Sequence, residues 1–132
     1  MSVNSVLLRK VEDVRGNLSV IEEMSNIPFE IRRVYWIYDV PGGEIRGSHA
    51  LRNTDEFIVA LSGSFDVVLK SNKCKENFSL NRSYKGIYVP RMTWRTLENF
   101  STNSIALVLA SGEYDSKEYI RDHDEFLDLM GT

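Results

Sequence analysis

One histidine stands at fixed spacing from glycines and a glutamate, and these residue types suit proton transfer. Five residues separate Gly43 from His49, six separate His49 from Glu56, and six more separate Glu56 from Gly63. A later series comprises Gly86, Pro90, Met92, Arg95 and Asn99. Histidine titrates near neutrality, so His49 is a candidate general acid or base.

Two side chains are best placed to orient such a histidine. Glu56 belongs to the same spaced series, and Tyr35 lies in a strand-like segment whose residues alternate between two faces. A purely structural role is the alternative for each group. On that interpretation His49 is a solvated or core histidine, and Tyr35 is a core aromatic residue.

Three arginines, Arg33, Arg46 and Arg95, are expected in the same half of the fold. Buried guanidinium groups need anionic partners, and arginine binds phosphate through paired hydrogen bonds. A phosphate-bearing ligand would explain all three. Solvated surface arginines are the alternative, because the chain as a whole is not basic.

The elements that must position these residues are mostly short strands. β-branched and aromatic runs bounded by turn residues predict strands at 3–9, 17–22, 31–40, 57–61, 64–69, 86–90 and 104–110. A turn is expected at residues 13–16, and Ser62-Gly63 predicts a tight hairpin. Within 31–40, Arg33 and Tyr35 share one face, and Val34 and Trp36 share the other.

The end of the chain breaks this pattern. Residues 115–130 have apolar side chains near helical spacing, with Asp115 or Ser116 as a cap, so a C-terminal helix is expected. Many short strands without alternating helices indicate an all-β protein, a sandwich or β-barrel. The length of 132 residues suits one domain, residues 1–132.

Composition limits the range of partners. The net charge is −3 and the basic residues are scattered, so binding to nucleic acid or to an anionic membrane is not expected. No apolar run approaches the length of a membrane span or a signal peptide. The single cysteine, Cys74, lies in a polar segment and excludes an internal disulfide. These features favour a cytoplasmic protein.

The two spaced series resemble the paired motifs of cupins, which are jelly-roll β-barrels. The first series is in register except that Leu51 stands where cupins carry a second metal-binding histidine. The second series is shortened by two residues, and Arg95 stands at its histidine position. Leucine has no donor atom, and arginine stays protonated and repels a cation. His123, the other histidine, is expected in the C-terminal helix. No metal site is therefore predicted.

Nearly the whole chain resembles the nucleotide-sugar 3,4-ketoisomerases, the WxcM-like cupins. Their most specific matching blocks here are Asp13–Leu18 and Arg46–Ala50. The match continues through residues 26–29, 33–35, 86–90, 94, 109–111, 114–115 and 119–121. The resemblance implies an isomerase that moves the ketone of dTDP-4-keto-6-deoxyglucose from C4′ to C3′ without a metal or organic cofactor. The product would serve the synthesis of 3-amino-3,6-dideoxyhexoses for lipopolysaccharide or S-layer glycans.

The same resemblance assigns roles to individual residues. His49 matches the catalytic histidine and would move the proton. Arg95, Tyr35 and Arg15 would assist the developing oxyanion as further catalytic residues. The expected substrate-binding residues are Arg33 and Arg46 at the diphosphate, Arg121 towards the nucleotide, and Glu56. A homodimer with N-terminal strands in its interface is also implied.

Several points stay open at this stage. Leu51 replaces a second histidine of many family members, so the second proton donor is not identified. The galacto or gluco configuration of the product is not decided by Arg15 and Arg95. The alternatives are a dTDP-sugar epimerase, a non-catalytic sugar-nucleotide-binding cupin and a metal-dependent cupin.

Overall fold

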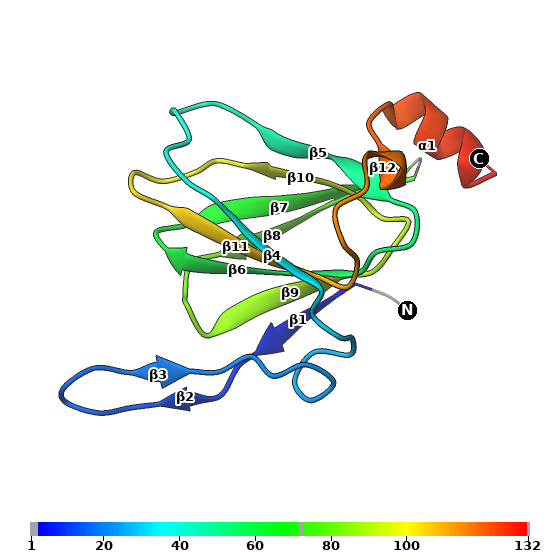
Figure 1. The fold of residues 1–132 in the computed structure, drawn as a ribbon. Helices are drawn as coiled ribbons and strands as arrows, with labels where there is room; N and C mark the ends of the chain where they lie inside the picture. Colours follow the sequence, from blue (N-terminus) through cyan, green and yellow to red (C-terminus); the bar gives the residue numbers. More distant parts are fainter. Residues whose placement is uncertain (1–2, 72, 132) are drawn as a thin grey trace.

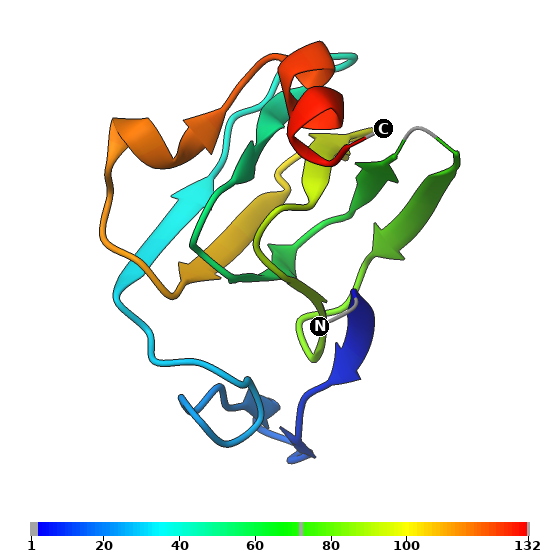
Figure 2. The same ribbon diagram turned by 90° about the vertical axis from the view of Figure 1, so that its right-hand side faces the viewer.

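Two five-stranded antiparallel sheets face each other in the computed structural model, which describes residues 3–71 and 73–131 (Figures 1 and 2). The first sheet has the order β1 (Asn4–Leu7), β9 (Lys85–Val89), β6 (Glu56–Ser62), β11 (Ile105–Ala110), β4 (Arg33–Ile37). The second has the order β12 (Tyr119–Ile120), β5 (Arg46–Leu51), β10 (Trp94–Glu98), β7 (Phe65–Lys70), β8 (Lys75–Leu80). The predicted all-β fold is confirmed.

An arm projects from this sandwich (Figure 1). It consists of β2 (Lys10–Val11) and β3 (Leu18–Ser19), which pair antiparallel around a turn closed by a hydrogen bond of 2.9 Å from the Gly16 amide to the Asp13 carbonyl. The turn expected at residues 13–16 is therefore present. Figure 2 shows the arm at one end of the molecule and α1 (His123–Leu129) at the other.

Apolar side chains between the sheets form the main core. Their alternation along the strands explains the layers, because inward residues such as Val67 and Val108 are fully buried. Strand β4 follows the predicted pattern, with Tyr35 packed against the core and Trp36 58% exposed. A second cluster covers the outer side of the first sheet. A third packs α1 on the second sheet through Ala50, Trp94, Ile120 and Phe126.

The predicted Ser62-Gly63 hairpin is wrong. Strands β6 and β7 flank it, but β6 pairs with β9 and β11, whereas β7 pairs with β8 and β10. Gly63 has φ +66°, and its turn carries the chain from one sheet to the other. A tight turn therefore joins two layers here, and each flanking strand pairs within its own sheet.

The continuous helix expected at residues 115–130 is also wrong in its extent. A short 3₁₀ helix (Ser116–Glu118) begins after Asp115, whose side chain caps it, and β12 follows. The helix begins only at His123, where the Asp122 carboxylate accepts from the Asp124 and Glu125 amides. Pairing of β12 with β5 overrides the helical spacing of Tyr119 and Ile120. Strands β5, β8 and β10 were not expected either.

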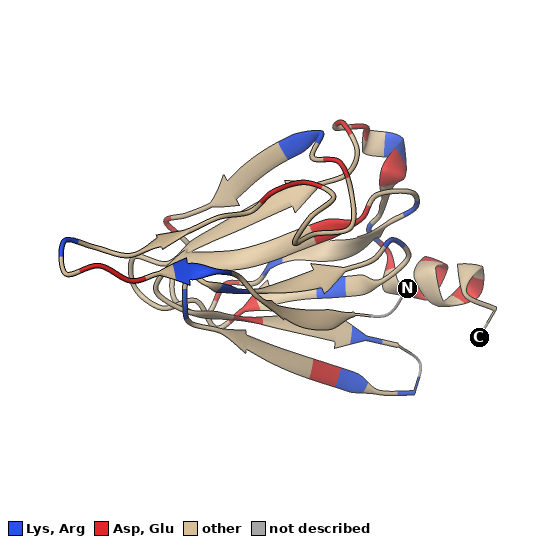
Figure 3. Cartoon of the chain, turned by 90° about the horizontal axis from the view of Figure 1, so that it is seen from below, with Lys and Arg blue, Asp and Glu red and all other residues tan. Residues whose placement is uncertain are grey.

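In the view of Figure 3, the Lys and Arg segments are scattered among Asp and Glu segments along the ribbon. Among the described residues, no helix is long and apolar enough to cross a membrane.

Candidate active site

Adjacent strands place His49 directly opposite Arg95. The two residues are register partners in the pairing of β5 with β10. Their sequence neighbours Ala50 and Trp94 face α1, so alternation turns His49 and Arg95 towards the space between the sheets. His49 is 6% exposed and Arg95 only 1%, so both polar side chains are buried.

The Arg95 guanidinium is held by groups from three other strands. It donates to Glu56 Oε1 at 3.0 Å from Nε and 2.8 Å from Nη2, and its Nη2 also lies 2.9 Å from the Tyr35 hydroxyl. That hydroxyl donates to Glu56 Oε2 at 2.7 Å. Burial alone would lower the pKa of Arg95, but the charge of Glu56 and the hydrogen bonds to it and Tyr35 raise it. The result is a neutralised, rigid ion pair.

Gly47 makes room for this ion pair. Its carbonyl accepts from Arg95 Nη1 at 2.9 Å, and its φ is +65°, a conformation that favours glycine. A methyl group at this position would collide with the Arg95 guanidinium. The glycine in the Arg46–Ala50 block is thus required by the close approach of Arg95.

His49 is a neutral imidazole in this environment. Burial, followed by the charges of Arg95, Arg121 and Arg33, lowers its pKa from 6.5 to about 2. Its Nε2 is buried and has no hydrogen-bond partner in the described part of the chain. The ring packs edge-to-face on Tyr119, with ring centroids 4.8 Å apart. At this pKa the imidazole is a weak base, and the negative charge of a bound anionic ligand would raise the pKa towards the range in which histidine accepts a proton.

This pKa predicts how stability responds to pH. Below pH 6.5 the unfolded chain protonates His49 while the folded chain does not, so protonation favours unfolding as the pH falls. We expect the free energy of unfolding, measured with urea between about pH 7 and 5, to fall more steeply for the wild type than for His49→Gln. Parallel pH dependences in the two proteins would show that His49 titrates normally.

Arg33 lies among three tyrosines beside His49. Its Nη1 donates to the Tyr119 hydroxyl at 3.1 Å, and its guanidinium carbon lies 5.4 to 6.0 Å from the ring centroids of Tyr35, Tyr114 and Tyr119. Within the described residues, Arg33 Nε is buried without a hydrogen-bond partner. Arg121 lies over the Tyr119 ring at 4.5 Å. Cationic groups thus surround His49, as an anionic ligand requires.

Arg46 and Arg15 lie elsewhere than Arg33 and Arg121. Arg46 is exposed and lines, with Tyr35, a groove of about 580 Å³ along the connection from β4 to β5. Arg15 is at the tip of the arm, where its side chain is 86% exposed and pairs with Asp13 at 2.9 Å. Within one copy of the chain, the structure brings together Arg33, Tyr35, His49, Glu56, Arg95 and Arg121, but not Arg15.

The donor set does not suit a metal ion. In residues 3–71 and 73–131, no three His, Cys, Asp or Glu side chains lie together as ligands. Leu51 is buried beside the site, and Arg95 occupies the remaining motif position. The charge of Arg95 is balanced by Glu56, so the Glu56 carboxylate is already engaged in an ion pair.

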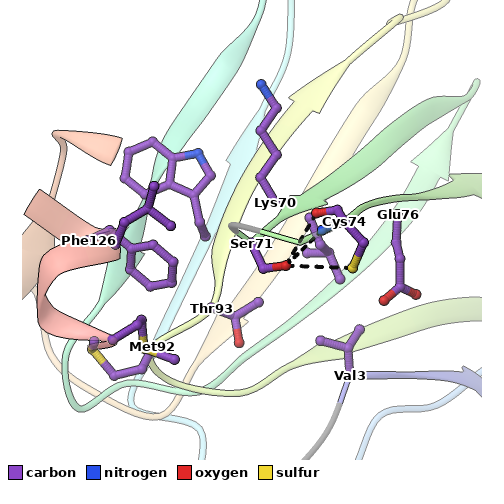
Figure 4. Close-up of a pocket in the computed structure, with 12 residues that line it drawn as sticks. Val3, Lys70, Ser71, Cys74, Glu76, Met92, Thr93 and Phe126 are labelled. Atoms are coloured by element: carbon purple, nitrogen blue, oxygen red, sulfur yellow. Dashed lines mark hydrogen bonds between the residues drawn. The ribbon is translucent and has the colours of Figure 1, made fainter. Parts of the chain in front are cut away.

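A separate hollow lies under α1 (Figure 4). It measures about 240 Å³ and is lined mainly by apolar groups, including Met92, Trp94 and Phe126. Trp94 and Arg95 are successive residues of β10 and point to opposite faces of its sheet. The hollow is therefore distinct from the site around His49.

Tyr119 is a site residue that the sequence reasoning missed. The helix predicted for residues 115–130 placed it on a helical surface, whereas β12 sets it against His49 and Arg33. The sequence signal for this strand is the pair Tyr119-Ile120, which is flanked by charged residues. Two residues are too few to identify a strand from sequence alone.

Known proteins that match the chain are sugar-nucleotide isomerases. The family model described as FdtA: WxcM-like, C-terminal matches residues 1–131. The chain belongs to the WxcM-like family. A TDP-4-oxo-6-deoxy-alpha-D-glucose-3,4-oxoisomerase from Aneurinibacillus thermoaerophilus is 41% identical over 118 residues, 89% of this chain and 85% of that protein.

Solved structures agree with this membership. QdtA, a sugar 3,4-ketoisomerase from Thermoanaerobacterium thermosaccharolyticum in complex with TDP, has a TM-score of 0.94 and 33% identity, covering 96% of this chain and 93% of its own. A histidine-to-asparagine variant of QdtA was solved with TDP-4-keto-6-deoxyglucose. The WlaRB TDP-quinovose 3,4-ketoisomerase from Campylobacter jejuni has a TM-score of 0.90 and 41% identity, covering 96% and 97%.

An epimerase shares the fold at much greater distance. NovW, a 4-keto-6-deoxy sugar epimerase from Streptomyces spheroides, has a TM-score of 0.77 but only 16% identity, with 89% of this WxcM-like chain and 67% of NovW covered. This likeness supports the predicted cupin-type jelly roll. The ketoisomerase relatives, by contrast, match in sequence as well as in fold.

Proposed function

We propose that this protein is a 3,4-ketoisomerase that moves the ketone of TDP-4-keto-6-deoxyglucose from C4′ to C3′. The observation that supports it best is a buried, neutral His49 beside the Arg95–Glu56–Tyr35 cluster, in a chain 41% identical to a TDP-4-oxo-6-deoxyglucose 3,4-oxoisomerase. Proton transfer beside a carbonyl needs a base near the carbon and help for the oxyanion. The cluster offers both.

In the first step, His49 removes the proton from C3′. The electrons of that C–H bond form a C3′–C4′ double bond, and the C4′ oxygen becomes an enediolate oxygen. Arg95 is the nearest fixed positive charge, at the register position opposite His49. Its charge stabilises this oxygen without having to reorganise, because Glu56 and the Tyr35 hydroxyl already hold the guanidinium in place.

The second step returns the proton to C4′. The O3′ proton passes to the C4′ oxygen, C3′ becomes the ketone, and His49 gives its proton to C4′. Leu51 has no proton to give, and the Tyr35 hydroxyl proton is engaged by Glu56 at 2.7 Å. Burial and the charge of Glu56 raise the pKa of Tyr35, which keeps it a neutral phenol. We therefore assign both transfers to His49.

The arginines around the histidine would bind the charged part of the substrate. Arg33, with a buried and unused N–H among the described residues, and Arg46 in the adjoining groove would contact the diphosphate. Arg121 would bind towards the nucleotide. Glu56 would contribute indirectly, by holding Arg95 and Tyr35 in the positions that meet the sugar.

A product assay tests this proposal. The purified protein would be incubated with TDP-4-keto-6-deoxyglucose in D₂O, and the sugar followed by NMR. A ketone at C3′ supports isomerisation, and the couplings of the C4′ proton give the galacto or gluco configuration. A retained C4′ ketone with an inverted neighbour would indicate an epimerase instead. Binding of TDP without solvent exchange would indicate a non-catalytic protein.

We also place the protein in the cytoplasm as a homodimer joined through the arm. The arm exposes several apolar side chains, including Val14 at 105% and Leu18 at 58%, which a partner surface would cover. In such a dimer, Arg15 at the arm's tip would approach the partner's site. Sedimentation equilibrium should give twice the mass of one chain, and Leu18→Asp should reduce it; a monomeric wild type would refute the dimer.

A further inference from the structure

Tyr119 joins the edges of the two sheets. Strand β12 ends the second sheet and β4 ends the first, and the hydrogen bond of 3.1 Å from Arg33 to the Tyr119 hydroxyl crosses between them. The ring of the same tyrosine lies edge-to-face against His49 at 4.8 Å. One side chain therefore contacts both the base and a phosphate-binding arginine of the proposed function.

The backbone on both sides of Tyr119 is firmly anchored. The Glu118 carboxylate accepts from the Asn53 amide at 3.1 Å, from Asn53 Nδ2 at 3.2 Å and from the Thr54 hydroxyl at 2.6 Å. On the other side, Ile120 is fully buried under α1. Tyr119 itself pairs with Leu51 across β5, two residues from His49. These contacts limit the movement of the tyrosine ring relative to the imidazole.

We propose that Tyr119 is a positioning residue with two separable parts, a ring that sets the place of His49 and a hydroxyl that sets the place of Arg33. This inference rests on the proposed ketoisomerase function. The ring acts on the base, so its loss should change kcat. The hydroxyl acts on an arginine that binds but does not react, so its loss should change KM.

Tyr119→Phe isolates the hydroxyl. The ring stays against His49, while Arg33 loses its hydrogen-bond acceptor. We expect KM for TDP-4-keto-6-deoxyglucose to rise about three- to tenfold and kcat to stay within about twofold of the wild type. Tyr84→Phe makes the same change in a tyrosine packed near Lys10, away from His49, and should alter neither constant.

Tyr119→Leu removes the ring and keeps an apolar side chain of strand-compatible size. We expect kcat to fall about tenfold or more, because His49 gains freedom and water. The imidazole should also titrate at higher pH. The charged and titratable groups around it are Arg95 of β10, Arg33 and Tyr35 of β4, Arg121 after β12, and Glu56 of β6 through Arg95. Of these, Arg33 and Arg121 also lose their contact with the Tyr119 ring in this variant.

NMR titration of the two histidine rings without substrate provides an independent measurement. His123→Gln assigns the signals, because the chain has only two histidines. In the wild type, His49 should not titrate above about pH 5, whereas in Tyr119→Leu it should. Failure of the wild type to form a 3-keto sugar would refute the proposed function, yet leave this titration valid.

Two results would overturn the inference about Tyr119. One is an unchanged His49 titration in a folded Tyr119→Leu protein. The other is a Tyr119→Phe protein in which kcat falls while KM is unaffected. Circular dichroism and thermal melting of each variant establish that the chain remains folded. If Tyr119→Leu does not fold, Tyr119→Phe still decides the hydroxyl part through its split between KM and kcat.

Discussion

His49→Asn should keep the fold and lose kcat by about 10²- to 10⁴-fold, the usual contribution of general acid–base catalysis. Asparagine is close to histidine in size but cannot take up the C3′ proton at neutral pH. Since His49 is proposed to make both transfers, incorporation of solvent deuterium at C3′ of the recovered substrate and at C4′ of the product should fall together. Turnover and deuterium incorporation are both measured by NMR with TDP-4-keto-6-deoxyglucose.

His123→Asn is the matched control for this experiment. His123 is also an imidazole with a buried Nε2 lacking a partner among the described residues, and it packs against Trp94 with ring centroids 4.9 Å apart. It begins α1, on the outer face of the second sheet. We expect near-normal turnover in this variant. Near-normal turnover in His49→Asn would remove His49 from the mechanism.

Glu56→Gln should destabilise the protein by about 3–5 kcal/mol, because it leaves the buried Arg95 charge without its carboxylate. Both side chains are almost fully buried, at 1% and 3% exposure, and the ion pair measures 2.8 Å. The Tyr35 hydroxyl would lose its charged acceptor as well. Urea denaturation monitored by circular dichroism gives the change in the free energy of unfolding.

Two further variants test the physical cause. Adding Arg95→Met to Glu56→Gln removes the unpaired charge and should recover much of the lost stability, although not the activity. Glu30→Gln breaks an exposed pair with Arg32, whose side chains are 62% and 56% exposed, and should cost less than about 1 kcal/mol. A similarly small loss in Glu56→Gln would contradict the buried-charge explanation.

The motif spacing selected residues that lie close together in the structure. His49 and Arg95 are register partners on neighbouring strands of one sheet, and Glu56 reaches Arg95 from the facing sheet. The alternation of β4 likewise placed Arg33 and Tyr35 on the side that contacts this centre. These positions depend on local periodicity, which a sequence displays directly.

Features that depend on long-range pairing could not be predicted in this way. The Ser62-Gly63 turn has the residues of a hairpin, but β6 pairs with the distant strands β9 and β11, and β7 pairs with β10 and with the nearby β8. Tyr119 and Ile120 have helical spacing, but the edge of β5 recruits them as a strand. Local propensity is a weak preference, and tertiary contacts overrode it in both places.

The crossing of the chain from one sheet to the other at Gly63 also bears on the rate of folding. Consecutive strands β5, β6 and β7 alternate between layers, so most strand pairs close long loops: β1 with β9, β4 with β11, and β5 with β10. Such topologies fold slowly, since loop entropy is lost before the contacts form. His49 and Arg95 meet only when β5 and β10 have paired, so a nascent or partly unfolded chain cannot hold an isolated functional site.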